Sequence, residues 1–163
     1  MTISMYAITV PVLTRYLSNL EAILVKAEAN AAERKIKPEV LAAARLAPDM
    51  HPLTFQVQSA TDRVKFLLAR LTGQTPPSWE DNETTLEHLR GRIQKALQYV
   101  GTFSEADLAG KEDGTVTLRD KQVPALDHAL YNALPQIFFH ITTAYAILRH
   151  NGVPVGKGDF TGA

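Results

Sequence analysis

The sequence predicts an all-α protein: an up-and-down four-helix bundle with a short hairpin or extended loop between helices 3 and 4. Two observations predict this fold. Four long segments carry apolar residues at alternating steps of four and three, the spacing that lines one face of an α-helix. Such spacing keeps each apolar face against its neighbours and is typical of bundles that cross at roughly 20°. No internal repeat is present, so we expect a single domain over residues 1–163.

The first helix is predicted from the apolar series that runs from Tyr6 to Ala31. Pro11 lies in this series and removes one backbone N–H, so it marks either the first turn of the helix or a kink in a longer one. Residues 38–44 begin with Pro and Glu and are rich in alanine, which predicts a short connecting helix.

The second long helix is expected to begin near Asp49, because aspartate is a good N-cap residue and Pro52 is tolerated in a first turn. Gly73 is expected to end it in a left-handed conformation. Its apolar series consists of Leu53, Val57, Ala60, Val64, Leu67 and Leu71.

The third helix is expected to begin near Asn82 or Thr84, because Thr84 and Glu87 have the spacing of a capping box. Residues 104–124 then break the helical period. Apolar and polar residues alternate there around an Asp-Gly pair, which favours a short hairpin or an extended loop.

The fourth helix is predicted over residues 125–149. Its apolar series consists of Leu126, Leu130, Leu134 (or Ala133), Ile137, Ile141, Ala144 and Leu148. Further aromatic residues lie off this series, namely Tyr131, Phe138, Phe139 and Tyr145. Apolar groups therefore cover most of the circumference of this helix. Either a homodimer interface through these aromatics or packing by the hairpin is expected to cover them, unless they fill a wide core.

The composition excludes several classes of function. Seventeen Lys and Arg balance seventeen Asp and Glu, so the positive field that attracts nucleic acids or anionic membranes is missing. The chain has no cysteine, which removes disulfides, thiolate metal sites and a cysteine nucleophile. We found neither a signal peptide nor a run of about 20 apolar residues. We therefore expect a cytoplasmic protein that binds neither nucleic acid nor membranes.

Polar residues recur every four positions on the fourth helix: His128, Asn132, Gln136 and His140. The last two project close to the core-facing sector. Side chains at i and i+4 lie one above the other on a helix, which is how two ligands can hold one metal ion. The alternative is that these residues are buried polar groups paired within the protein, which is the commoner situation.

The levels of the helices suggest partners for these residues. If the bundle runs up-down-up-down, helices two and four are parallel, so His51 lies beside His128 in a ligand-binding pair at the rim. His140 lies about 18 Å further along, level with Gln58 and Asp62. These two residues, with Gln136 and His140, form a candidate interior metal site. On an ideal helical wheel, however, the helix-two members fall opposite the apolar series.

Three stretches resemble an uncharacterised bacterial family of unknown function related to the DinB/YfiT-like metalloenzyme superfamily. They are residues 45–50 (RLAPDM), 79–85 (WEDNETT) and 138–154 (FFHITTAYAILRHNGVP), and the resemblance extends over essentially the whole chain. It implies a DinB-like up-and-down bundle, commonly dimeric. In many relatives three histidines hold a divalent ion, one from helix two and two from an H-x-x-x-H pair on helix four. Some relatives are thiol-dependent transferases or isomerases.

Carried onto this chain, the resemblance places His140 on the second histidine of that pair and Gln136 on the first. The helix-two histidine falls near Gln58 or Ser59. Two of the three ligands are therefore different, and amide oxygens bind zinc or nickel more weakly than imidazole does.

Two hypotheses about function follow. The first is a non-catalytic homodimer, or one with a degenerate metal site, that binds a small ligand in its core. The alternative is an enzyme of thiol-dependent transferase, isomerase or hydrolase type, in which a divalent metal such as Zn or Ni is centred on His140.

Overall fold

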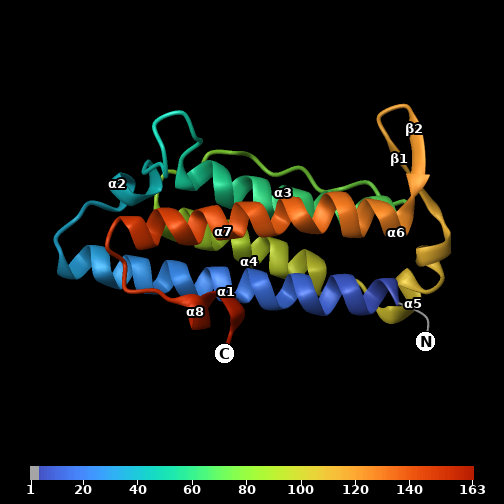
Figure 1. Cartoon of the computed structure of the whole chain (residues 1–163), viewed down its shortest axis with the longest axis horizontal. Coiled ribbons are helices and arrows are strands. Elements are labelled where there is room, and N and C mark those ends of the chain that lie inside the picture. The colour runs from blue at the N-terminus through green and yellow to red at the C-terminus, as the bar shows by residue number, and fades with distance from the viewer. Residues whose placement is uncertain (1–3) are drawn as a thin grey trace.

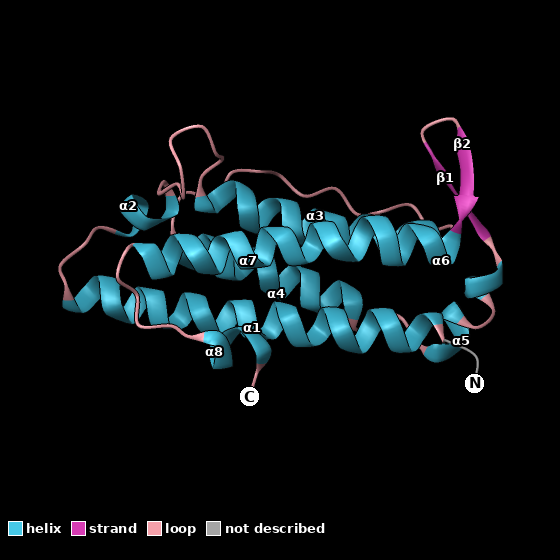
Figure 2. Cartoon of the chain, in the orientation of Figure 1, coloured by secondary structure: helices cyan, strands magenta, loops and turns pink. Residues whose placement is uncertain are grey.

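The computed structural model describes residues 4–163. In chain order the elements are α1 (Met5–Glu33), α2 (Pro38–Ala42), α3 (Leu53–Thr72), α4 (Leu86–Val100), α5 (Glu105–Leu108), the 3-10 turn η1 (Lys111–Asp113), β1 (Thr115–Leu118), β2 (Lys121–Pro124), α6 (Ala125–Asp127), the π-helical turn η2 (His128–Ala133), α7 (Leu134–His150) and α8 (Lys157–Thr161). The four long helices, with α6, η2 and α7 forming one continuous rod, pack lengthwise (Figures 1 and 2). The prediction of an all-α bundle is confirmed.

The helices α1 and α7 run in the same direction. The rings of Tyr16 and Phe138 lie 4.8 Å apart, and further along both helices Arg34 donates a hydrogen bond to the carbonyl of Asn151 over 2.7 Å. Residue numbers therefore rise together along this pair. The short helix α8 then packs back on α1, where Asn19 donates to the carbonyl of Phe160 over 2.9 Å.

The helices α3 and α7 run in opposite directions. Gln56 contacts His140, whereas Arg63, two turns further along α3, contacts Gln136, one turn earlier on α7. The expected parallel arrangement of these two helices is therefore wrong. Any pairing of residues that relied on that arrangement has to be replaced.

The helix α4 is antiparallel to α1, because Arg90 meets Glu28 at 2.9 Å while Gln94 meets Glu21 at 2.7 Å. It follows that α3 and α4 are parallel, so the predicted up-and-down topology, in which successive long helices alternate in direction, is wrong. A long crossover, residues 73–85, links them by running back along the bundle (Figure 1). This crossover supplies acidic residues to a buried ion-pair network described below.

Two helix starts differ from the expected ones. The helix α3 begins at Leu53 with Pro52 as N-cap, because residues 45–52 form an irregular segment instead of an early first turn. At the start of α4 the capping residue is Thr85, whose hydroxyl accepts from the N–H of His88 at 3.2 Å. Gly73 ends α3 in the left-handed conformation, as expected.

The helix α1 begins at the N-cap Ser4 and continues through Pro11. Among the described helices, α1 is the one long and apolar enough to cross a membrane by length and composition. This is weak evidence, since the core helix of a soluble bundle passes the same test. Ten residues of α1 are buried within the described part of the protein, where they pack in the core.

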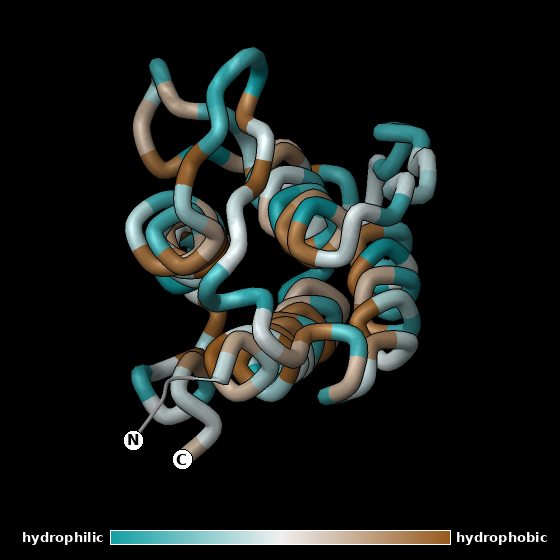
Figure 3. The backbone as a smooth tube through the Cα atoms, turned by 90° about the vertical axis from the view of Figure 1, so that its right-hand side faces the viewer, coloured by the Kyte–Doolittle hydropathy of each residue, from teal (hydrophilic) through white to brown (hydrophobic). Residues whose placement is uncertain are grey.

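Seen along its length, the bundle has its long helices around a shared interior (Figure 3). Of the two alternatives expected for residues 104–124, the structure has the hairpin, with Val116 paired to Val123 and Leu118 to Lys121; the Asp-Gly pair precedes it. This register leaves Arg119 and Asp120 as the two-residue turn between the strands.

The fourth rod contains a π-helical turn over residues 128–133, just before Pro135. Pro135 has no N–H to donate to the carbonyl four residues earlier. In an i→i+5 turn, that carbonyl accepts a hydrogen bond from the N–H of the residue after the proline instead. The extra residue moves the buried positions back by one. Ala125 and Ala129 are therefore buried, and the predicted core residues Leu126 and Leu130 are only half-buried.

Candidate functional site

A buried imidazole lies in the seam between α3 and α7. His140 is 7% exposed, and its Nδ1 atom is 2.8 Å from Oε1 of Gln56. The amide nitrogen of Gln56 donates to the carbonyl of His51 over 3.0 Å, which turns the amide oxygen toward the ring. An oxygen can only accept, so the proton of His140 is placed on Nδ1 and Nε2 keeps its lone pair.

The environment keeps this ring neutral. Burial, followed by the charges of Arg63 and His51, lowers the pKa of His140 from 6.5 to about 4. At neutral pH the seam therefore contains an uncharged imidazole with one free nitrogen. That form is able to bind a metal ion or to accept a proton.

Aromatic rings surround the imidazole. The ring of Phe55 lies 6.1 Å from that of His140, and the ring of Phe139 lies 5.3 Å from it. His51 is exposed and stacks on Phe55 at 3.9 Å. The expected pair of His51 and His128 is therefore wrong, because His51 lies at the His140 end of α3.

Gln136 has a different partner from the one expected. Its Oε1 atom accepts a hydrogen bond from Nε of Arg63 at 2.8 Å, and its amide nitrogen donates to Oδ1 of Asn132 at 3.0 Å. The amide oxygen that would have to bind a cation is thus engaged by a guanidinium. This positive charge also disfavours any cation near His140.

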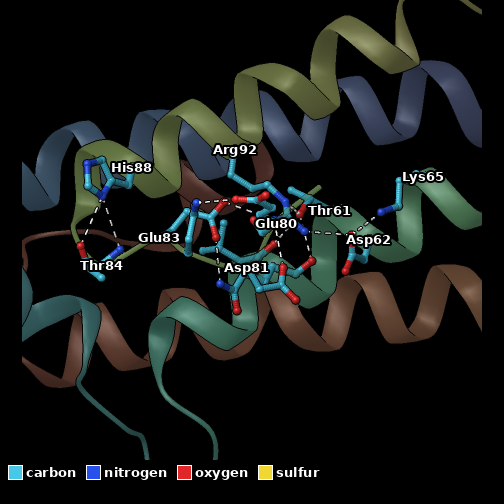
Figure 4. Close-up of polar contacts among 12 residues, drawn as sticks. Thr61, Asp62, Lys65, Glu80, Asp81, Glu83, Thr84, His88 and Arg92 are labelled. Carbon is cyan, nitrogen blue, oxygen red and sulfur yellow. Dashed lines mark hydrogen bonds and ion pairs between the residues drawn. The ribbon is translucent and has the colours of Figure 1, made fainter. Parts of the chain in front are cut away.

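The other two members of the expected interior site point elsewhere. Asp62 is paired with Arg92 at 2.9 Å and with Lys65 at 2.8 Å (Figure 4). Gln58 donates to Glu83 over 2.8 Å. The proposed grouping of Gln58 and Asp62 with Gln136 and His140 is therefore wrong. The phase of α3 turns these two side chains toward α4 and the crossover.

Arg92 is the centre of that second polar network. It is 1% exposed and also contacts Asp81 at 3.0 Å, Glu83 at 3.2 Å and the hydroxyl of Thr61 at 3.1 Å. Trp79 covers it, with its ring 5.2 Å from the guanidinium. A buried charge requires such complete pairing, so we interpret the network as structural: it attaches the crossover to α3 and α4.

The donor set does not fit a metal ion. Within residues 4–163, no group of three His, Cys, Asp or Glu side chains could hold one. His140 is a single imidazole, Gln136 is engaged by Arg63, and the nearest amide oxygen, that of Gln56, accepts from the ring. Zinc and nickel normally require more and stronger ligands than this.

A second feature of the seam is a pocket at its far end, about 430 Å³ in volume. It lies between α3, the hairpin and the π turn. His128 lines it, is 3% exposed, and has no partner within the described residues for either ring nitrogen. Burial and then the charge of Arg70 lower the pKa of His128, so this ring is also neutral.

Sequence reasoning found His140, His128 and Gln136 but missed Gln56, Arg63 and Arg92. Gln56 directly precedes Val57 of the apolar series, and a polar residue beside such a series was the available signal. The two arginines gave no signal, because their burial and partners depend on which helices become neighbours.

The fold and this site define a class: a helical bundle whose α3–α7 seam holds an isolated neutral histidine instead of a set of metal ligands. Residues 5–161 match the family described as a domain of unknown function (DUF1993), and the chain belongs to this family. It is also similar to the crystal structure of a DinB family member protein from Shewanella denitrificans, at 47% identity and a TM-score of 0.92, over 97% of this chain and 92% of that one. No curated protein matches the chain.

Proposed function

We propose that this protein is a non-catalytic, DinB-like bundle with a degenerate metal site, and that it binds a small ligand in the α3–α7 seam. The observation that carries the proposal is the 2.8 Å hydrogen bond from Arg63 to Gln136. This bond puts a permanent positive charge at the position where the related H-x-x-x-H pattern has its first histidine. The neutral charge balance and the core-like burial of α1 support a cytoplasmic location.

Elemental analysis tests the metal part of this proposal. The protein is purified without a histidine tag, incubated with zinc or nickel, and desalted. We expect less than stoichiometric metal in both the wild type and a His140→Ala variant. Stoichiometric metal in the wild type that is lost in the variant would contradict the proposal.

That second outcome would support the alternative, a metal-dependent enzyme centred on His140. One observation favours it: the hydrogen bond to Gln56 holds the ring in the tautomer whose Nε2 is available to an ion or a proton. Metal ligands commonly have such a partner on the other ring nitrogen.

We further propose that the protein is a homodimer through the exposed aromatic residues of η2 and α7. Phe139 is 57% exposed and Tyr131 is 77% exposed, and Leu46 lies beside Phe139 in a shallow apolar depression. Exposed apolar groups of this size are typical of interfaces. Light scattering should give twice the chain mass for the wild type and the chain mass for Phe139→Glu. If the wild type is a monomer, or if the Phe139→Glu variant is still a dimer, this interface is contradicted.

A further inference from the structure

The pocket beside His128 has an unusual charge for a protein with a balanced composition. Three arginines line it, namely Arg63 and Arg70 from α3 and Arg119 from the hairpin, and no acidic residue is among its lining residues. Within residues 4–163 none of the three forms a salt bridge with a carboxylate. Three arginines around one pocket, without carboxylate partners, favour an anion there.

Neutral polar groups complete the wall. His128 is almost entirely buried, yet both of its ring nitrogens lack a partner in the described part of the chain. Such orphaned groups are costly and rare in folded proteins. A neutral imidazole offers one N–H donor and one acceptor, so a polar ligand that contacts the ring from the pocket would supply a partner for one of its nitrogens.

The local backbone also points to this region. The π turn that buries His128 is of a kind often found at functional sites. Arg119 is in the hairpin turn with φ of 55°, a conformation that favours glycine or asparagine. An arginine in this strained position contributes the hairpin's positive charge to the pocket.

Arg63 links the pocket to the rest of the seam. It uses only Nε for its bond to Gln136, and its terminal nitrogens have no other hydrogen-bond partner within residues 4–163. The volume of about 430 Å³ exceeds that of a simple ion and lies in the range of small-molecule sites.

We infer that this pocket binds the oxyanion group, a phosphate or a carboxylate, of a small molecule held between Arg70, Arg119 and His128. The inference rests on the ligand-binding part of the proposed function. It depends neither on metal content nor on the dimer.

An NMR titration of the full chain tests it, with inorganic phosphate and citrate as the two probes and ionic strength held constant with sodium chloride. We expect saturable shifts confined to the C-terminal half of α3, the hairpin and the π turn. Tighter binding of phosphate or of citrate identifies which oxyanion the site prefers. Failure of both probes to saturate would overturn the inference.

Variants locate the site. Arg70→Gln and Arg119→Gln should each weaken binding about tenfold, because each removes a charge-assisted hydrogen bond. The control is Arg149→Gln, which removes one exposed positive charge at the opposite end of α7 and should leave the affinity unchanged. An equal loss in the control would show non-specific charge attraction and would overturn the inference. Circular dichroism confirms that each variant is folded.

The buried histidine provides a second readout. His128→Leu replaces the polar ring by a buried apolar side chain without nitrogens, and should weaken binding of the preferred probe while leaving the charge of the pocket intact. Unchanged affinity in a folded variant would overturn the role of His128. Because metal content and mass are measured separately, failure here is distinguishable from failure of the degenerate-site or dimer proposals.

Discussion

The Nδ1 atom of His140 lies 2.8 Å from Oε1 of Gln56, and this contact sets both the tautomer of the ring and the direction of its free nitrogen. It joins the middle of α7 to the first turn of α3. Four predictions concern this contact, the two buried histidines, the Arg92 network and the Arg63–Gln136 bond.

The first prediction concerns the charge of the partner. Gln56→Glu puts a carboxylate beside the imidazole, and an opposite charge at this distance favours the protonated ring. We expect the pKa of His140 to rise from about 4 by roughly 1–3 units, measured from the NMR titration of the ring carbons.

Gln56→Leu is the matched comparison. It leaves the buried N–H of His140 without an acceptor, which should lower the free energy of unfolding by about 1–3 kcal/mol. A pKa of His140 that is the same in Gln56→Glu and in the wild type would contradict the assigned contact.

The second prediction is a loss of stability in mild acid. The pKa of His140 is about 4 in the folded state and 6.5 ordinarily, so between these values the unfolded chain binds more protons. The free energy of unfolding should therefore fall as the pH falls from 6.5 toward 4, by up to about 1.4 kcal/mol per pH unit for this group. Urea unfolding at a series of pH values measures it.

His128 contributes to the same trend, because its pKa is also lowered. His140→Gln should reduce the slope without abolishing it, whereas the double variant with His128→Gln should flatten it further. A slope identical in the wild type and His140→Gln would mean that His140 is not held neutral by the fold.

The third prediction compares two arginines of α4. Arg92 is 1% exposed and pairs with three carboxylates, whereas the Arg90 side chain is 29% exposed and pairs with Glu21 and Glu28. Arg92→Met leaves uncompensated acidic groups and should lower the free energy of unfolding by about 3–5 kcal/mol. Arg90→Met should lower it by less than about 1 kcal/mol.

Urea unfolding followed by the fluorescence of Trp79 measures both variants, since this is the single tryptophan and its ring lies 5.2 Å from the Arg92 guanidinium. Equal effects of the two substitutions would show that the Arg92 network does not hold the crossover in place.

The fourth prediction is that the charge of Arg63 disfavours metal binding beside His140. Gln136→His creates an i, i+4 pair of imidazoles with His140 but leaves the Arg63 charge beside it. We expect weak zinc binding in this variant, and binding about tenfold tighter or more when Arg63→Gln is added. Calorimetric titration with zinc measures both; Arg149→Gln in place of Arg63→Gln is the control. Equal zinc affinity with and without Arg63 would contradict its role.

The sequence by itself determined the helices, the hairpin and the presence of His140 in the interior. These features depend on local rules: the spacing of apolar residues, the left-handed glycine that ends α3, and the alternation of apolar and polar residues along the hairpin. Such rules act within one or two turns, so they can be read without knowing the neighbours of a segment.

Only the tertiary structure decided the site. Because α3 and α7 are antiparallel, His51 and His128 lie at opposite ends of their seam. The rotation of α3 about its axis directs Asp62 toward Arg92 instead of toward His140. The π turn before Pro135 moves the buried face of its rod by one residue, which an ideal helical wheel does not include. Helix direction and phase are set by packing against distant segments, and the sequence pattern is compatible with more than one arrangement of them.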